Sequence, residues 1–267
     1  MAFEQISFER DGSVGVIMLD RPERMNAWTP QMMEEMRRAI SECNDDPSIG
    51  AVVVSGNGRA FCAGADIALF RQRLSARESG EKRAGSEAGP ADAYQWVSFI
   101  RRSKPIVAAV NGVAVGVGVT QILPMDVRVC SERAKFGFFF VKMGLVPELA
   151  SSALLPQLVG CGRAREWCLT GRFVLPEEAR RSGLVTHVFA HEELLSAAKV
   201  VAADIAAHSR TSIMAIRGLL DENGFSHDLA AVAGREAEAM RRCYRSWEHK
   251  EAVAAFIEKR KPDFSPR

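Results

Sequence analysis

The sequence lacks the cysteine patterns of metal-binding and redox proteins. Its six cysteines form no C-x-x-C pair, and no cysteine and histidine cluster has the spacing of a zinc site. The cysteines lie at positions 43, 62, 130, 161, 168 and 243. His187 and His191 flank the end of an expected strand, so we expect no metal site. Scattered, reduced thiols are typical of a cytoplasmic protein.

Long charge runs, a signal peptide and a membrane-spanning segment are also missing. The net charge is +2, and no basic run points to a nucleic-acid partner. The first residues, MAFEQISFERDG, contain no apolar core of a signal peptide. Gly112 and Gly116 form a G-x-x-x-G pattern, but Pro105 and Pro124 interrupt the apolar window that a membrane helix needs. We therefore expect a cytoplasmic protein that binds neither nucleic acid nor membrane.

The 267 residues, of which 47% are hydrophobic and 25% charged, fit one large globular domain or a domain with an appendage. Strands are predicted at 6–9, 14–19, 51–56, 106–110, 126–130, 134–137 and 185–189, and helices at 30–44, 91–103, 148–159, 163–170 and 176–182. This alternation predicts an α/β fold. The polar segment 71–90 predicts a mobile loop. Residues 1–193 then form a core, and the mainly helical region 194–267 serves packing between subunits.

Two glycine turns are the candidate functional segments. Residues 106–121 read IVAAVNGVAVGVGVTQ, a buried strand that breaks at glycines and leads into a helix start. The unpaired backbone N–H groups of such a start can bind developing negative charge. The second segment, 61–67, reads FCAGADI. A strand and helix with glycines used only for close packing is the alternative interpretation of the first segment.

Together these segments resemble the enoyl-CoA hydratase/isomerase family, also called the crotonase superfamily. The matching stretches are 21–27, 61–67, 104–116, 134–137, 144–147 and 255–262. The resemblance covers nearly the whole chain and implies a crotonase-type spiral of repeated ββα units with a helical C-terminal region. It also implies an acyl-CoA thioester substrate, with coenzyme A as part of the substrate and no separate cofactor. The implied assembly is a homotrimer or a dimer of trimers.

The resemblance also implies roles for particular residues. The backbone N–H groups of Ala63 and Val117 would hold the thioester oxygen. Losing one such donor typically costs about 100- to 1,000-fold in rate. The implied coenzyme A contacts are Arg24 near the 3′-phosphate, Ala60, Asp66 and Ile67 along the adenine and pantetheine, and Phe256 and Lys259 from a neighbouring subunit.

The sequence departs from the hydratases of this family at two positions. Those enzymes use two glutamates, where this chain has Thr120 and Phe140. Activating a water normally needs such a carboxylate, so we do not expect efficient hydration. Glu148 stands where the resemblance implies a lone acid in Δ3,Δ2-enoyl-CoA isomerases. One carboxylate suffices there, because C2 and C4 of a 3-enoyl chain lie about 2.5 Å apart.

Alternatives remain for Glu148 and for the function. A glutamate after Pro147 is also a common helix opening, where the acid favours the helix dipole. Three functions follow from the resemblance: a Δ3,Δ2-enoyl-CoA isomerase, a hydratase or thioester hydrolase of the same fold, and a non-catalytic acyl-CoA-binding protein. The missing glutamates disfavour the second, and Glu148 favours the first over the third.

Overall fold

A computed structural model of the protein describes residues 2–68, 71, 75, 90–224 and 226–265. The predicted mobile loop at 71–90 lies almost wholly outside these residues.

The strands are β1 (Ile6–Asp11), β2 (Val14–Leu19), β3 (Ala51–Gly56), β4 (Ala60–Cys62), β5 (Ile106–Val110), β6 (Val113–Val115), β7 (Val127–Ser131), β8 (Lys135–Gly137), β9 (Phe173–Val174) and β10 (His187–Phe189). The helices are α1 (Pro30–Asp45), α3 (Pro90–Arg102), α4 (Val117–Thr120), α5 (Ser151–Val159), α6 (Cys161–Thr170), α7 (Pro176–Ser182), α8 (Leu194–Ala206), α9 (Arg210–Asn223), α10 (Leu229–Arg245) and α11 (Trp247–Ile257). Short 3-10 turns are η1 (Pro22–Arg24), η2 (Val141–Met143) and η3 (His191–Glu193).

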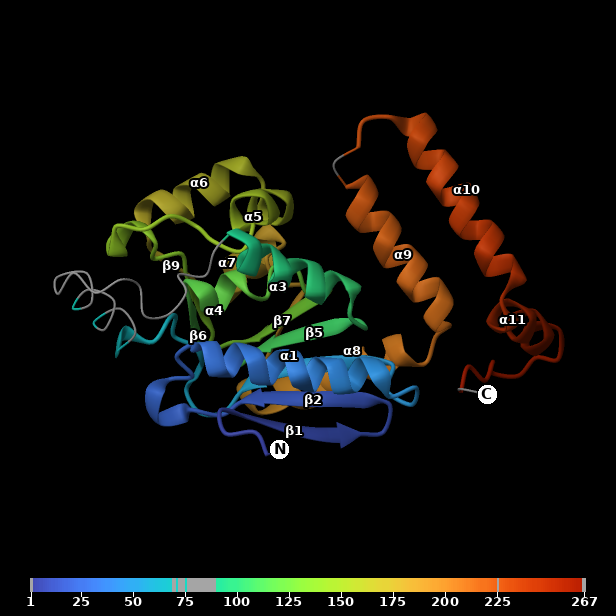
Figure 1. Cartoon of the computed structure of the whole chain (residues 1–267), viewed down its shortest axis with the longest axis horizontal. Helices are drawn as coiled ribbons and strands as arrows, with labels where there is room; N and C mark the ends of the chain where they lie inside the picture. The colour runs from blue at the N-terminus through green and yellow to red at the C-terminus, as the bar shows by residue number, and fades with distance from the viewer. Residues whose placement is uncertain (1, 69–70, 72–74, 76–89, 225, 266–267) are drawn as a thin grey trace.

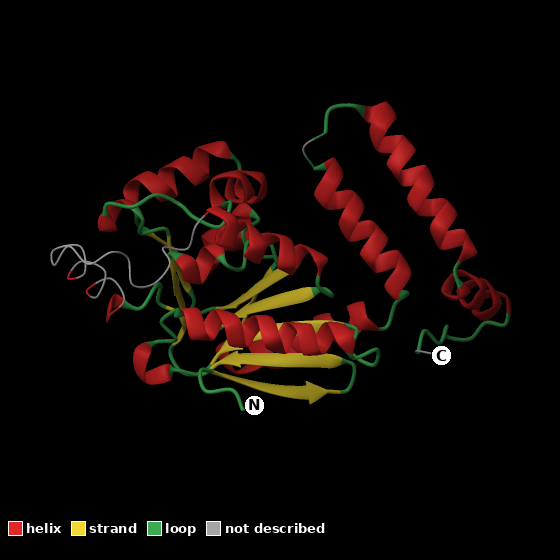
Figure 2. Ribbon diagram, viewed as in Figure 1, coloured by secondary structure: helices red, strands yellow, loops and turns green. Residues whose placement is uncertain are grey.

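Two sheets carry the fold, which confirms the predicted α/β class (Figure 2). The larger sheet has the order β1-β2-β3-β5-β7-β10; its β1–β2 hairpin is antiparallel, and the remaining pairs are parallel. The smaller sheet has the order β4-β6-β8-β9. From β3 to β8 successive strands alternate between the two sheets. Each ββ unit therefore places one strand in each sheet.

The central strands of the larger sheet are buried on both faces, as their β-branched sequences predict. Val52 and Val54 of β3 face the hydrophobic cluster that contains the apolar side of α1. Ala51 and Val53 face the opposite cluster, which contains α8. Figure 1 shows α1 lying along one face of this sheet. At the start of α1, the Thr29 hydroxyl accepts a hydrogen bond from the Met32 N–H and caps the helix.

The C-terminal helices divide into one that covers the sheet and three that extend beyond it. Leu194, Ala198 and Ala202 of α8 are buried against the larger sheet. Figure 1 shows α9, α10 and α11 lying to one side of the sheets. By its packing, α8 therefore belongs to the core. The predicted boundary between residues 193 and 194, which assigns 194–267 to packing between subunits, stays a prediction. No helix among the described residues is long and apolar enough to cross a membrane.

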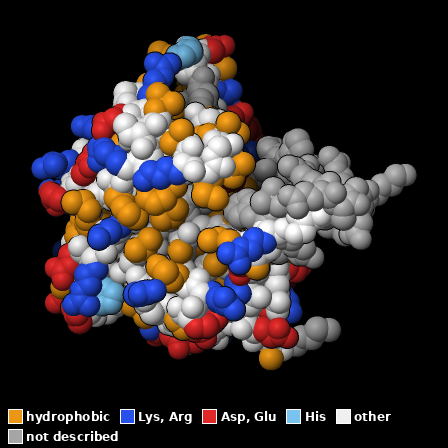
Figure 3. Space-filling view, turned by 90° about the vertical axis from the view of Figure 1, so that its left-hand side faces the viewer, with side chains coloured by type: hydrophobic (Ala, Val, Ile, Leu, Met, Phe, Trp, Pro, Cys, Tyr) orange, Lys and Arg blue, Asp and Glu red, His pale blue; other side chains and the backbone are white. Residues whose placement is uncertain are grey.

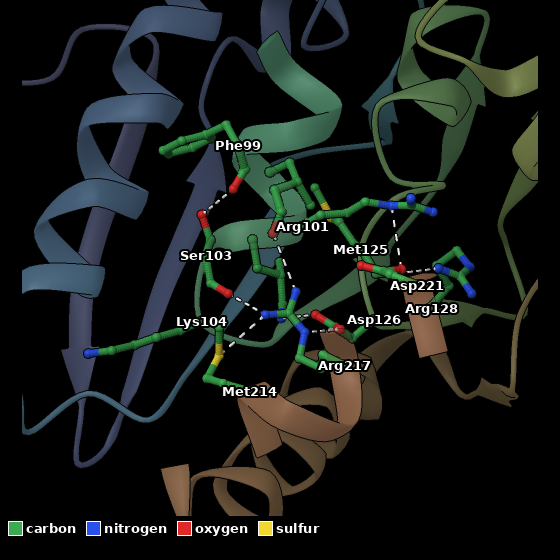
Figure 4. A network of polar contacts seen from close by, with 12 residues as sticks. Phe99, Arg101, Ser103, Lys104, Met125, Asp126, Arg128, Met214, Arg217 and Asp221 are labelled. Carbon is green, nitrogen blue, oxygen red and sulfur yellow. Dashed lines mark hydrogen bonds and ion pairs between the residues drawn. The ribbon is translucent and has the colours of Figure 1, made fainter. Parts of the chain in front are cut away.

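An arginine of α9 anchors this extension to the core (Figure 4). The Arg217 guanidinium pairs with Asp126 and donates to the carbonyl oxygens of Ser103 and Ile100, near the end of α3. A cavity of ≈ 210 Å³ lies beside this anchor, lined by residues of α3, α5 and α9 and by the segment 123–128. Arg217 and Asp126, which form the anchor, also line the cavity. The cavity is therefore part of the same polar network.

The smaller sheet gathers the glycine turns at one edge. Its strands β4, β6 and β8 run parallel and end at Cys62, Val115 and Gly137. The turns that follow them therefore meet at the carboxyl edge, where α/β proteins commonly bind ligands. Gly118 of α4 packs directly against β4, because a Cβ atom there would lie 2.1 Å from the carbonyl oxygen of Cys62.

Replacing Gly118 with alanine tests this close packing. Gly118→Ala should lower the free energy of unfolding by about 1–3 kcal/mol, the usual cost of overpacking a rigid site. Gly162→Ala is the matched control, because a Cβ atom at Gly162 meets no atom within 4 Å. Urea unfolding measures both. Equal stabilities for the two variants would contradict the packing argument.

Candidate functional site

The start of α4 presents unpaired backbone donors, as the glycine turn predicts. The N–H groups of Val119 and Thr120 donate to the Gly116 carbonyl oxygen. No hydrogen bond among the described residues uses the N–H groups of Val117 or Gly118. The first N–H groups of a helix have no intrahelical acceptor and carry partial positive charge. Val117 is therefore positioned as the sequence predicts for a donor to an oxyanion.

The other predicted donor, Ala63, is not free. Its N–H donates to the Met25 carbonyl oxygen at 3.1 Å, so the Ala63 prediction is wrong for this structure. The chain then turns at Gly64, whose φ of +105° is a backbone conformation that favours glycine. A Cβ atom at Gly64 would lie 3.3 Å from the carbonyl oxygen of Val115. The turn after β4 thus lies against the end of β6, immediately before α4.

Ala65, two residues further along the chain, has a backbone N–H that is not used in this way. The Trp28 N–H donates to the Gly64 carbonyl at 2.8 Å, and the Asp66 N–H donates to the Trp28 carbonyl at 3.0 Å. In an extended segment, successive N–H groups point to opposite sides. The Ala65 N–H therefore points away from Trp28, and no hydrogen bond among the described residues uses it. Sequence reasoning missed this residue by two positions, because the pairing with Trp28 is a tertiary contact.

Glu148 lies beside α4 and is held by Thr120. The Thr120 hydroxyl donates to Oε1 of Glu148 at 2.6 Å, and Thr120 itself is fully buried. Burial raises the pKa of the Glu148 carboxyl above its ordinary value, and the Thr120 hydrogen bond offsets part of this rise. Thr120, which stands where the resemblance places a hydratase glutamate, thus orients the Glu148 carboxyl. Val117 and Thr120 are three residues apart on α4, so one helical turn carries both a donor and the partner of the base.

The backbone around Glu148 is not a helix opening, which corrects the predicted helix at 148–159. Leu149 and Ala150 adopt left-handed φ angles of 53° and 56°, and α5 begins only at Ser151. Such angles in non-glycine residues cost about 1–3 kcal/mol each and concentrate at functional sites. The carboxyl of Glu148 therefore precedes the strained turn and not the first turn of a helix.

The segment after β8 forms the apolar wall that the Phe138–Phe140 run predicts. Phe138 is fully buried and stacks on Trp167 with the ring centroids 5.7 Å apart. Phe140 is 5% exposed, so the position of the second hydratase glutamate lies within the apolar interior. The wall contributes no side chain that transfers protons.

Asp66 is engaged in structural contacts. It pairs with Arg21 at 3.1 Å and accepts from the Ala68 N–H at 3.0 Å. The Ala68 hydrogen bond is the largest cause that lowers the pKa of Asp66, and Arg21 and Arg24 lower it further. This carboxylate is therefore a weak base. Arg24, predicted to bind the 3′-phosphate, is exposed at the end of η1.

The remaining predicted coenzyme A contacts are dispersed. Ile67 is 63% exposed, as a surface contact requires. Ala60 is buried and its carbonyl oxygen accepts from the Asn26 amide, so its side chain is not on the surface. Phe256 and Lys259 lie in or just after α11, which Figure 1 places at the opposite end of the molecule from α4 and β6. Within this chain, Phe256 and Lys259 are therefore not part of the site.

Comparison with known proteins identifies the family. The family model for enoyl-CoA hydratase/isomerase matches residues 9–267. The chain belongs to this family. Crotonyl-CoA hydratase of Syntrophomonas wolfei is 34% identical over 265 residues and covers 99% of each chain. Short-chain-enoyl-CoA hydratase of Clostridium acetobutylicum is 30% identical over 262 residues, 98% of this chain and 97% of the relative.

Solved structures of the family share the fold. The crystal structure of enoyl-CoA hydratase from Bacillus anthracis superimposes with a TM-score of 0.88 at 26% identity, over 99% of this chain and 100% of that chain. The predicted crotonase fold is therefore confirmed. The relatives named above are called hydratases, and the family designation covers both hydratases and isomerases.

The pKa of Glu148 predicts the pH dependence of activity. If Glu148 acts as a base, kcat/KM should fall as pH decreases, with a midpoint above the ordinary glutamate pKa, because burial favours the protonated acid. Thr120→Val keeps the shape and removes a hydrogen bond that lowers the pKa, so it should move the midpoint to higher pH. A midpoint that Thr120→Val leaves unchanged would contradict the assignment.

The same pKa rise has a consequence for stability. The folded protein binds the Glu148 proton more tightly than the unfolded chain does, so stability decreases as pH rises from the ordinary glutamate pKa through the raised one. Glu148→Gln removes the buried charge and should flatten this decrease. Urea unfolding at several pH values measures the difference.

Proposed function

We propose that the protein shifts a double bond in an acyl-CoA thioester from the Δ3 to the Δ2 position. Glu148 takes a proton from C2, and the electrons move onto the thioester oxygen to give an enolate. The same carboxyl then returns the proton to C4, which moves the double bond and restores the carboxylate. The Thr120–Glu148 hydrogen bond of 2.6 Å carries this proposal, because it holds one carboxylate of raised pKa beside the donors of α4.

The enolate oxygen would accept hydrogen bonds from the N–H groups of Ala65 and Val117. Both are backbone donors in rigid turns, so they need no reorganisation when the charge develops. The turns that carry them are adjacent, since Gly64 lies against Val115 and Gly118 against Cys62. Coenzyme A enters as part of the substrate.

Hydration of a 2-enoyl-CoA is the second candidate, and the names of the relatives favour it over isomerisation. In that reaction Glu148 would deprotonate a water molecule that attacks C3. The apolar environment of Phe140 and the single carboxylate held by Thr120 favour isomerisation. A non-catalytic acyl-CoA-binding protein would have no need of the oriented Glu148.

Replacing the carboxylate tests the catalytic proposal. Glu148→Gln keeps the shape but removes the base, so turnover of 3-enoyl-CoA should fall by at least about 100-fold while thioester binding remains. Glu34→Gln, an exposed glutamate of α1, is the matched control and should react as the wild type does. Ultraviolet absorbance follows the reaction.

Mass spectrometry of the wild-type product separates the two candidate reactions. Isomerisation leaves the mass unchanged, whereas hydration adds one water. If Glu148→Gln keeps near wild-type turnover, the base assignment is wrong. If the wild type hydrates 2-enoyl-CoA at roughly 1 per second or more, hydration replaces isomerisation as the function.

The surface supports assembly into a homotrimer or a dimer of trimers. None of the residues of α9 is buried, and exposed apolar side chains follow α9 to α11. They are Ile216, Leu220, Leu229, Met240, Tyr244, Val253, Phe256 and Ile257. Figure 3 shows a further gathering of apolar side chains on the left-hand side of the molecule as drawn in Figure 1. Patches of this kind commonly mark protein–protein contacts.

Sedimentation tests the assembly. We expect a trimer or hexamer at micromolar concentration, because the exposed apolar side chains of α9–α11 then become buried between copies. Phe256→Asp places a charge on an 85% exposed apolar residue and should weaken the assembly. A wild-type monomer at micromolar concentration would contradict the proposal.

A further inference from the structure

The side-chain amide of Gln121 is buried without a partner. Gln121 is 0% exposed, and neither its Nε2 nor its Oε1 has a hydrogen-bond partner among the described residues. Asn26 is equally buried, but its amide accepts from the Arg21 N–H and donates to two carbonyl oxygens. Buried polar groups are nearly always hydrogen-bonded. Within the described part of the chain, the Gln121 amide therefore has an unused donor and an unused acceptor.

Gln121 belongs to the helical turn that carries the site. It follows Thr120, has helical φ and ψ, and its N–H donates to the Val117 carbonyl oxygen at 3.0 Å. Residues four apart on a helix share a face, so Gln121 shares one with Val117. The Trp96 indole N–H donates to the Gln121 carbonyl oxygen at 3.1 Å and fixes its backbone. The amide thus belongs to the same turn as the oxyanion donor and the partner of the base.

A second buried polar group without a partner lies three residues after Glu148 in the sequence. Ser151 is 2% exposed, and its hydroxyl has no hydrogen-bond partner among the described residues. The Ser151 N–H donates to the Glu148 carbonyl oxygen at 3.0 Å. Along α5, Leu154 and Leu158 follow Ser151 at helical spacing and line a cavity together with Leu123. The face of α5 that carries Ser151 is therefore turned towards the segment just after Gln121.

We infer that Gln121 holds a hydroxyl oxygen within the acyl-CoA site, with Ser151 as a second partner. This inference rests on the proposed function and adds a polar subsite to it. An amide offers one donor and one acceptor on adjacent atoms, and a hydroxyl group offers the complementary pair. Nε2 donates to the hydroxyl oxygen, and Oε1 accepts its proton. The hydroxyl belongs to the acyl chain of the thioester.

Binding of unreactive acyl-CoA thioesters tests the subsite without relying on turnover. Calorimetry would compare butyryl-CoA with 3-hydroxybutyryl-CoA and 4-hydroxybutyryl-CoA. The wild type should bind one of the hydroxylated thioesters at least about fivefold more tightly than butyryl-CoA, since each hydrogen bond makes a modest net contribution. A preference for the 3-hydroxy ligand places the subsite beside C3, and a preference for the 4-hydroxy ligand places it beside C4.

Gln121→Met keeps the length of the side chain and removes both polar atoms. It should abolish the preference while leaving the Kd of butyryl-CoA within about twofold of the wild-type value. Gln157→Met makes the same change at an exposed glutamine of α5 and should keep the preference. Gln121→Leu repeats the test if the methionine variant does not fold.

Two results would overturn the inference. The wild type binding all three thioesters equally would show that the amide does not reach the ligand. If both Gln121 variants still prefer a hydroxylated thioester, a side chain other than Gln121 binds the hydroxyl group. Binding of butyryl-CoA itself tests the proposed substrate class, so its absence would count against the proposed function and not only against the subsite.

Discussion

The contact between the turns that follow β4 and β6 is the constraint on which the site depends. At Gly118 the helix α4 approaches the carbonyl oxygen of Cys62 so closely that no side chain fits between them. At Gly64 the opposite turn lies against Val115. This packing brings two sets of backbone N–H groups to one edge of the smaller sheet. It also fixes the direction of α4, which decides where Thr120 points.

The direction of α4 gives the base its environment. Thr120 holds one oxygen of Glu148, while burial keeps the carboxyl harder to ionise than a free glutamate. The left-handed residues Leu149 and Ala150 turn the chain between Glu148 and α5. In the proposed reaction, the backbone would stabilise the enolate and one side chain would transfer the proton. The apolar wall that includes Phe140 supplies no side chain for either step. This distinguishes the chain from an enzyme with two catalytic glutamates.

The elements of the fold were predictable, because β-branched runs and glycine turns act locally. Strand 106–110 and helix 30–44 are examples. The failures involve contacts between distant residues. The resemblance implied Ala63 as a donor, and the sequence does not reveal that the Ala63 N–H donates to the Met25 carbonyl oxygen. The true start of α5 depends on left-handed angles at Leu149 and Ala150, which neither residue type favours. Likewise, only the folded chain reveals that the Gln121 amide has no partner.

Exchange of the C2 proton tests the central claim most directly, since isomerisation as proposed begins with an enolate formed by Glu148. The protein would be incubated with a saturated acyl-CoA in D2O, and the thioester analysed by mass spectrometry. The account predicts deuterium at C2 with the wild type and almost none with Glu148→Gln. A wild type that exchanges no faster than buffer alone, although it binds the thioester, would contradict the account.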